Sequence, residues 1–248
     1  MRTQQQEGIA VIGKMARILD LLAIDSSINA TQLSQRLDIP RTTIHRILQT
    51  LIAENVITPN HTLDSRPIRW ASRALKELGI SKASVESLER LAAKFEETAT
   101  VFLRSGSSRI CIDRREPIQQ VRHSIDAGVT MPLHVGSAGR VLLAWLTDEE
   151  RKTLIEESAS WSGLPADPYH TDWGEVRTRG YVMTSGERDP LLASVSVPVF
   201  GDDGQVVLAL CLSGPRMRMP DERLIAMAKG LREEADVLGQ RIGRVGFR

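Results

Sequence analysis

The fold of the N-terminal part of this chain is decided by the stretch Leu37-Asp38-Ile39-Pro40-Arg41-Thr42-Thr43-Ile44-His45-Arg46-Ile47-Leu48. Pro40 cannot continue the helix before it, because it has no backbone N–H, but it can start the next one. From Arg41 to Glu54 the apolar residues recur at helical spacing and form a single stripe. The stretch therefore predicts two helices joined by a tight turn at residues 38–40.

The face of the second helix opposite this stripe is polar and basic near its N-terminus. A helix fits the major groove of DNA, and the residues that reach base edges lie near its N-terminus. On an isolated helix these side chains could also be ordinary solvated charges, so the elements around the helix decide between the two interpretations. We expect DNA contacts from Arg41, Thr42, Thr43, His45, Arg46 and Gln49.

Two shorter helices are predicted upstream. Helical spacing indicates one at Ile12–Ala23 and another at Ala30–Leu37. Asn29 is a suitable N-cap for the latter, and Gln32 stands where a capping box requires Glu or Gln. Thr31 and Gln32 open this helix, where backbone N–H groups commonly meet phosphate. Both are therefore predicted DNA contacts.

A small wing is predicted after the third helix. A short strand at Val56–Thr58 and a return strand near Pro67–Trp70 would form it, and Arg66 would reach the DNA from it. Three helices followed by a hairpin describe a winged helix-turn-helix. Residues 1–75 carry nine Lys and Arg against six Asp and Glu, whereas the whole chain of 248 residues has a net charge of only +1. This modest basic excess favours a nucleic-acid partner for the N-terminal part.

The pattern changes from helical to alternating after residue 98. The predicted strands are Thr100–Arg104, Arg109–Arg114, Ile118–Ser124, Tyr181–Thr184, Ala193–Phe200 and Val206–Ser213. The predicted helices are Ser137–Leu146, Asp148–Glu157, Asp172–Arg179 and Asp221–Ile242. Strands joined by hairpin turns and flanked by helices predict an α+β domain on a mainly antiparallel sheet. The expected domains are a winged helix-turn-helix at 8–72, a helical linker at 73–82 and the α+β domain at 83–248.

At this point the sequence resembles the IclR family of bacterial transcriptional regulators. The opening stretch resembles that family's "LGLPKSTVHRLL" segment, and Pro132–Ala144 (PLHVGSAGRVLLA) resembles its "PLHATALGKALLA". Arg179–Tyr181, Ala193–Phe200 and Leu212–Pro215 follow in the family's order and spacing. The resemblance extends from about residue 9 to residue 243.

The resemblance implies a function for both domains. The C-terminal domain would be GAF-like and bind a small effector, commonly an organic or aromatic carboxylic acid. The chain would bind palindromic double-stranded operator DNA as a dimer or a dimer of dimers, with its affinity controlled by the effector. The alternative is a winged-helix protein whose C-terminal domain only dimerises or binds a protein partner.

Six positions are carried over from the family as an effector pocket: Ser137, Ala138, Thr184, Ser194, Cys211 and Ser213. The free N–H groups at the predicted helix start near Ser137 would favour an anion. The sequence departs from the family at Thr184, where an acidic residue is usual, and at Leu191, where Gly is usual. Ser194 and Cys211 stand where Cys and Ser are usual. A smaller or more apolar effector is the interpretation that follows.

Other classes of protein find little support in the sequence. Cys111 and Cys211 match no metal or redox spacing and are expected to be buried thiols. A Cys–His hydrolase that uses His134 would need a nucleophile signature, and the sequence has none. We therefore expect no catalytic residue and do not expect an enzyme. No metal site and no cofactor are predicted. Without an apolar run long enough to span a membrane or a signal peptide, a cytoplasmic protein is expected.

Overall fold

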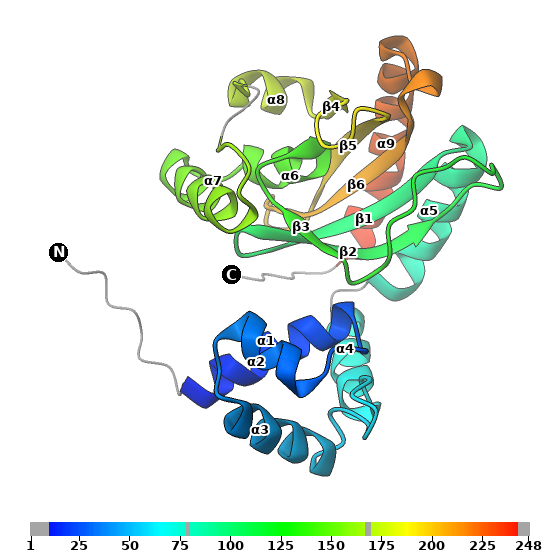
Figure 1. Cartoon of the computed structure of the whole chain (residues 1–248). Coiled ribbons are helices and arrows are strands. Elements are labelled where there is room, and N and C mark those ends of the chain that lie inside the picture. Colours follow the sequence, from blue (N-terminus) through cyan, green and yellow to red (C-terminus); the bar gives the residue numbers. More distant parts are fainter. Residues whose placement is uncertain (1–9, 78–79, 167–169, 243–248) are drawn as a thin grey trace. The chain divides into compact units, whose positions relative to one another are not determined.

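The computed structural model describes residues 10–77, 80–166 and 170–242 (Figure 1). The chain divides into two compact units, with the division between Leu75 and Lys76. This point lies inside the predicted linker 73–82.

The first unit has a core of its own, built mainly by its first three helices, and a fourth helix follows. The helices are α1 (Ala10–Ile24), α2 (Ala30–Leu37), α3 (Arg41–Ala53) and α4 (Ser65–Glu77). The apolar stripe of α3 is buried together with Ile18 of α1 and Leu33 of α2. The predicted capping box of α2 is confirmed, because the Asn29 side chain accepts from the backbone of Gln32 and the Gln32 side chain accepts from the backbone of Asn29. The helix-turn-helix is thus formed as the sequence predicted.

The predicted wing is wrong in its second half. Residues Pro67–Trp70 lie in α4, not in a strand, and the hairpin is reduced to one antiparallel bridge between Ile57 and Leu63. At the start of this helix, the Asp64 carboxylate accepts a hydrogen bond of 2.6 Å from the backbone N–H of Ser65. This short distance is typical of a charge-assisted bond. Pro67 then falls in the first turn, where its missing N–H costs no helical hydrogen bond.

The second unit contains one antiparallel sheet of six strands. The strands are β1 (Thr98–Ser105), β2 (Ser108–Arg115), β3 (Thr130–Pro132), β4 (Val182–Ser185), β5 (Leu192–Phe200) and β6 (Val206–Pro215). Their order in the sheet is β3-β2-β1-β6-β5-β4. Every pair is antiparallel, so the predicted α+β domain on a mainly antiparallel sheet is confirmed.

Helices cover both faces of this sheet (Figure 1). The helices are α5 (Ile80–Phe95), α6 (Gly136–Ala144), α7 (Asp148–Ser162), α8 (Trp173–Arg179) and α9 (Asp221–Arg241). Successive side chains of a strand point to opposite faces. Leu208, Leu210 and Leu212 of β6 accordingly pack with α5 and α9, whereas Ala209 and Cys211 pack with α6.

The predicted strand at Ile118–Ser124 is wrong. This segment joins no strand, and its apolar side chains point to solvent, since Ile118 is fully exposed. Side chains from elsewhere bind its backbone instead: Thr98 donates to the carbonyl of His123, and Arg218 donates to that of Val121. The strand that pairs with β2 comes later, as β3. The segment nevertheless brings His123 to the pocket described below.

Candidate nucleic-acid interface and ligand pocket

The basic face of α3 is open to solvent. Arg41, Thr42, His45, Arg46 and Gln49 are exposed, and Thr43 is partly buried. Neither Arg41 nor Arg46 forms an ion pair with any residue in the described ranges 10–77, 80–166 and 170–242. Both guanidinium groups are therefore available to phosphate and to base edges, because the helix buries its other face.

The start of α2 differs from what its sequence suggested. The side-chain oxygen of Asn29 accepts from the backbone N–H groups of Thr31 and Gln32, at 3.0 Å each. These two donors are already bonded to the N-cap side chain within the helix, so the predicted contact of Thr31 and Gln32 with DNA stays a prediction. Thr31 is exposed, and only its hydroxyl is left to reach DNA.

Arg66 has a partner inside the protein. Its guanidinium forms an ion pair of 3.0 Å with Glu54, the C-cap residue of α3. Because Arg66 lies in α4 rather than in a wing, the strand that was expected to carry it to DNA is absent. Its predicted contact with DNA remains untested.

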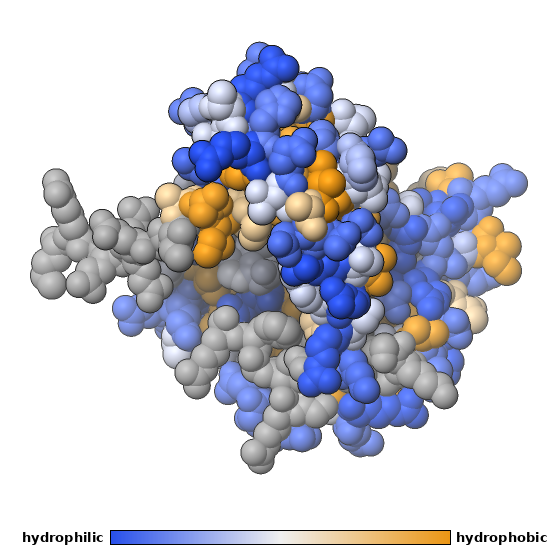
Figure 2. Space-filling model, turned by 90° about the horizontal axis from the view of Figure 1, so that it is seen from below, coloured by the Kyte–Doolittle hydropathy of each residue, from blue (hydrophilic) through white to orange (hydrophobic). Residues whose placement is uncertain are grey.

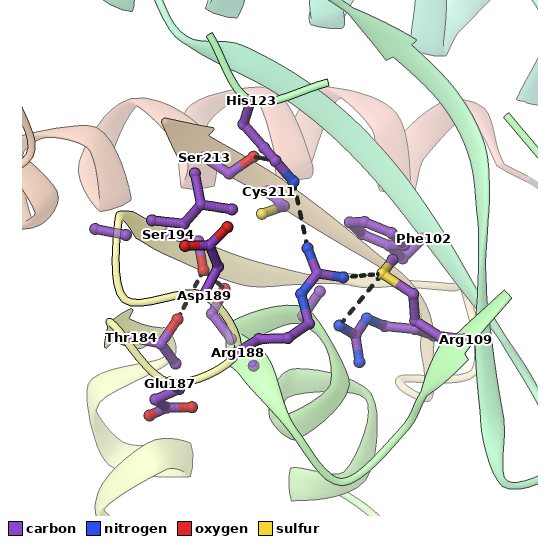
Figure 3. Close-up of a pocket in the computed structure, with 16 residues that line it drawn as sticks. Phe102, Arg109, His123, Thr184, Glu187, Arg188, Asp189, Ser194, Cys211 and Ser213 are labelled. Atoms are coloured by element: carbon purple, nitrogen blue, oxygen red, sulfur yellow. Dashed lines mark hydrogen bonds between the residues drawn. The ribbon is translucent and has the colours of Figure 1, made fainter. Parts of the chain in front are cut away.

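In the second unit, all six residues carried over as an effector pocket line a single cavity of about 60 Å³ (Figure 3). Ser137 and Ala138 come from α6, Thr184 from β4, Ser194 from β5, and Cys211 and Ser213 from β6. The sheet brings Thr184, Ser194 and Ser213 side by side, since Ser194 pairs with Ser213 and with Thr184 across neighbouring strands. The small volume suits a small ligand.

One wall of this cavity is a chain of hydroxyl groups. Ser194 lies 2.8 Å from Thr184 and 2.7 Å from Ser137, measured between side-chain oxygens, and Ser137 lies 2.8 Å from Ser196. Each hydroxyl can both donate and accept, and the Cys211 sulfur is a further hydrogen-bond partner of Ser137 and Ser196. The wall is therefore polar and hydrogen-bonded within itself.

Sequence reasoning missed the other ten lining residues, and five of these bear polar or charged side chains: Arg109, His123, Glu187, Arg188 and Asp189. Arg109 belongs to β2, whereas the others lie in segments without regular structure. The alternating pattern of β2 gave a weak signal for Arg109, because it put this residue on the same face as the buried Cys111.

Arg109 is an almost fully buried cation, with 4% of its surface exposed. It donates to the backbone carbonyls of Pro132 and Val135, and its Nε has no partner among the residues that the structure describes. Burial first, and the nearby charge of Arg188 second, lower the pKa of Arg109 to about 9. Arg109 therefore remains charged at neutral pH, although its surroundings penalise the charge.

Arg188 reaches into the same space from the loop before β5. Its guanidinium lies 3.3 Å from Nε2 of His123, whose Nδ1 lies 2.8 Å from the hydroxyl of Ser213. Burial and the Arg188 charge lower the pKa of His123 to about 4. The ring is consequently neutral near pH 7, and it contributes hydrogen bonding but no charge.

The N-terminus of α6 is occupied by a carboxylate of the protein itself. Glu187 accepts from the backbone N–H of Gly136 and forms a buried ion pair of 2.6 Å with Arg140. Burial raises the pKa of Glu187, and Arg140 opposes that rise. Arg140 is thus held in a buried salt bridge. The first N–H of this helix start is consequently not free for an effector.

The cysteines are not arranged for nucleophilic chemistry. Both are buried, as predicted, and burial raises the pKa of Cys111 to about 12 and raises that of Cys211. A reactive cysteine requires a lowered pKa. His134 lies 2.8 Å from the Ser158 hydroxyl, which also accepts from the backbone of Leu133, so this histidine holds its own loop in place.

Two features are absent from the residues that the structure describes. Among them, no three His, Cys, Asp or Glu side chains gather in a way that could hold a metal ion. None of their helices combines the length and apolarity needed to cross a membrane.

Comparison with known proteins covers both units. The family model described as the IclR helix-turn-helix domain matches residues 11–61, and the model described as the C-terminal part of the bacterial transcriptional regulator IclR matches residues 72–239. The regulator BhcR of Paracoccus denitrificans is 28% identical, over 92% of this chain and 85% of its own. The regulator KdgR of Escherichia coli is 26% identical, over 89% of this chain and 88% of its own. Such relatives are named as transcriptional regulators, not as enzymes.

Solved structures agree with the fold. An IclR transcriptional regulator from Alicyclobacillus acidocaldarius is 25% identical and superposes with a TM-score of 0.81, over 95% of this chain and 100% of its own. An IclR homologue from Microbacterium hydrocarbonoxydans, solved with 4-hydroxybenzoate, is 18% identical with a TM-score of 0.75, over 94% of this chain and 98% of its own. The chain belongs to the IclR family, as a transcriptional regulator with a helix-turn-helix DNA-binding domain and a C-terminal effector-binding domain.

Proposed function

We propose that this chain binds a palindromic operator as a dimer or a dimer of dimers, and that a small organic acid controls its affinity for that operator. The observation that carries the proposal is the exposed, unpaired basic start of α3, on a helix whose opposite face is buried. A two-fold assembly would present two such helices roughly 34 Å apart, one turn of DNA.

Within this proposal, Arg41 and Arg46 read the operator. Each can pair bidentately with a guanine edge, while Thr42 and Thr43 offer a methyl to thymine or a hydroxyl to phosphate. His45, Gln49 and the Thr31 hydroxyl add polar contacts, with Gln32 beside them. Arg66 contributes only if its ion pair with Glu54 opens.

Self-association is supported by apolar side chains that the first unit leaves exposed. Val11 and Ile12 of α1 are 51% and 54% exposed, and Trp70 of α4 is 56% exposed. Val11 and Ile12 also line a groove beside α3, together with Met15 and Ile47. The face of the molecule drawn in Figure 2 is mostly hydrophilic, with hydrophobic patches between the hydrophilic residues. Isolated apolar residues are common on surfaces, so the oligomeric state is measured in the test below.

The test is to map the DNA that the full chain binds in a genome, and then to titrate that site. We expect Arg46→Ala to weaken specific binding by about 1–3 kcal/mol at fixed salt, if Arg46 contacts a base. Lys152→Ala removes the same charge from the exposed surface of α7 and should leave the affinity unchanged. Light scattering of the complex reports the number of chains per site. Equal affinity of Arg46→Ala and the unmodified chain would remove Arg46 from the interface.

A further inference from the structure

Two arginine side chains meet in the pocket without a carboxylate partner. Arg109 and Arg188 both direct a donor at the sulfur of Met131, Arg109 at 3.8 Å and Arg188 in closer contact. Figure 3 shows the two guanidinium groups next to each other, with dashed lines from both to one sulfur atom. A thioether is a weak acceptor. Neither arginine forms an ion pair with a carboxylate in the described part of the chain.

The charges around the pocket leave a surplus of about one positive charge. Glu187 is paired with Arg140, so these two cancel. Asp189 lines the pocket, but its carboxylate accepts from the backbone N–H of Leu191 at 2.8 Å and is paired with neither arginine. His123 is neutral at pH 7. The two guanidinium groups therefore carry two positive charges, and Asp189 balances only one of them. One of the two, Arg109, is almost fully buried.

Burying one cation beside another is costly unless a counter-ion compensates. The Arg109 Nε is buried with no acceptor in the described part of the chain, so this guanidinium keeps an unsatisfied donor. A monovalent anion would balance the surplus charge, and a planar carboxylate matches the donor geometry of guanidinium groups.

We infer that Arg109 and Arg188 form a clamp for the carboxylate of a small monocarboxylic acid, whose remaining polar atoms face the hydroxyls of Ser194 and Thr184. The inference rests on the proposed function, because it specifies the ligand of the same pocket. The cavity of about 60 Å³ restricts the ligand to a small acid. The sequence alone favoured a smaller or more apolar effector. The two arginines argue against an apolar one.

Arg188 carries the test, because its side chain is exposed and its replacement leaves the buried core in place. The full chain is melted in sodium acetate, glycolate, benzoate or phosphate, each against sodium chloride at equal ionic strength. Acetamide, glycolamide and benzamide serve as neutral matches. Any compound that raises Tm is then titrated by calorimetry into the unmodified chain and into the variants Arg188→Gln, Arg188→Lys and Arg179→Gln. The last variant removes an exposed arginine of α8 that does not line the pocket.

We expect at least one carboxylate to raise Tm above its chloride control and its amide to have no effect. Arg188→Gln should weaken binding of that carboxylate at least about tenfold, as expected for the loss of a charge-assisted hydrogen bond. Arg188→Lys should retain part of the affinity, and Arg179→Gln should bind like the unmodified chain. The clamp is excluded if no carboxylate raises Tm, if phosphate alone does, if the amides act equally, or if Arg188→Gln binds unchanged.

Operator binding, measured on the same variants, separates this inference from the proposed function. Arg188→Gln should bind operator DNA without ligand as the unmodified chain does. If it does, and the carboxylate experiments fail, the clamp is wrong while the regulator stands. If the unmodified chain binds no specific DNA, the proposed function fails whatever the carboxylates do.

Discussion

At the residue scale, His123 makes the stability of the second unit sensitive to acid. Its pKa is lowered from 6.5 to about 4 by burial and by Arg188, so the unfolded chain takes up a proton between these pH values while the folded chain does not. Stability is therefore unaffected above pH 6.5 and falls as the pH drops towards 4. The loss from this group between pH 7 and pH 5 is about 1–2 kcal/mol, with the lower figure allowing for the partial exposure of the ring.

Urea unfolding of the full chain and of His123→Gln, at pH 7 and pH 5, measures this contribution. Other groups titrate over the same range, so the comparison of the two proteins is what counts. We expect His123→Gln to lose about 1–2 kcal/mol less stability than the unmodified chain on acidification. Parallel losses in the two proteins would show that His123 does not titrate as its surroundings indicate.

Single residues also show where sequence reasoning reaches the pocket and where it stops. Ser137, Ala138 and Ser194 lie in motifs with a recognisable order along the chain, so their positions could be transferred. Arg109 lies in β2, and its burial depends on the turns at Pro132 and Val135, which pack over it from another part of the chain. Arg188 lies in a loop that has no periodic pattern. Both arginines thus depend on tertiary contacts that local sequence does not specify.

At the element scale, the N-cap of α2 should contribute measurably to the stability of the first unit. Asn29 satisfies two backbone donors of this short helix, at 3.0 Å each. Asn29→Ala should destabilise the unit by about 1 kcal/mol, whereas Asn29→Asp should be close to neutral because Asp caps equally well. Thermal unfolding followed by circular dichroism provides the comparison. Equal Tm values for Asn29→Ala and Asn29→Asp would contradict the assigned role of the side chain.

The close approach of α6 to the loop before it gives a second prediction at this scale. A Cβ at Gly139 would overlap the carbonyl oxygen of Leu133 and crowd Arg109. Gly139→Ala should therefore destabilise the second unit by about 1–3 kcal/mol, as overpacking does. Gly13→Ala is the matched control, because Gly13 lies in α1 with open space around it and should gain up to about 1 kcal/mol. A Gly139→Ala chain as stable as the unmodified one would mean that α6 can shift away from the loop.

The elements themselves were predictable where their pattern was periodic. The stripe of α3 was enough because this helix buries one face, and the continuous apolar run of β6 was enough because this strand is buried on both faces. The wing failed because Pro67 was taken as a strand residue although it suits the first turn of a helix. The strand predicted at 118–124 was wrong because the segment has no neighbouring strand to pair with. Side chains bind its backbone carbonyls instead.

At the scale of the whole molecule, the proposed switch couples two sites that belong to different units. A ligand can change the affinity for DNA only if it binds one arrangement of the chain better than another. The coupling is reciprocal, so operator DNA must change the affinity for the ligand by the same factor. Helix α5 joins the second unit to the preceding helix and packs on α9, which makes it the element expected to transmit the change.

The last prediction measures this reciprocity directly. The carboxylate that raises Tm is titrated into the full chain with and without operator DNA, and the DNA is titrated with and without the carboxylate. We expect the same factor in both directions, about 5- to 150-fold for a typical coupling of 1–3 kcal/mol. Arg188→Gln serves as the control, because it should bind DNA normally while the carboxylate loses its effect at the same concentration. If the carboxylate binds but the affinity for DNA stays constant, the pocket does not control the DNA-binding domain, and the second unit has a role in assembly or in binding a partner instead.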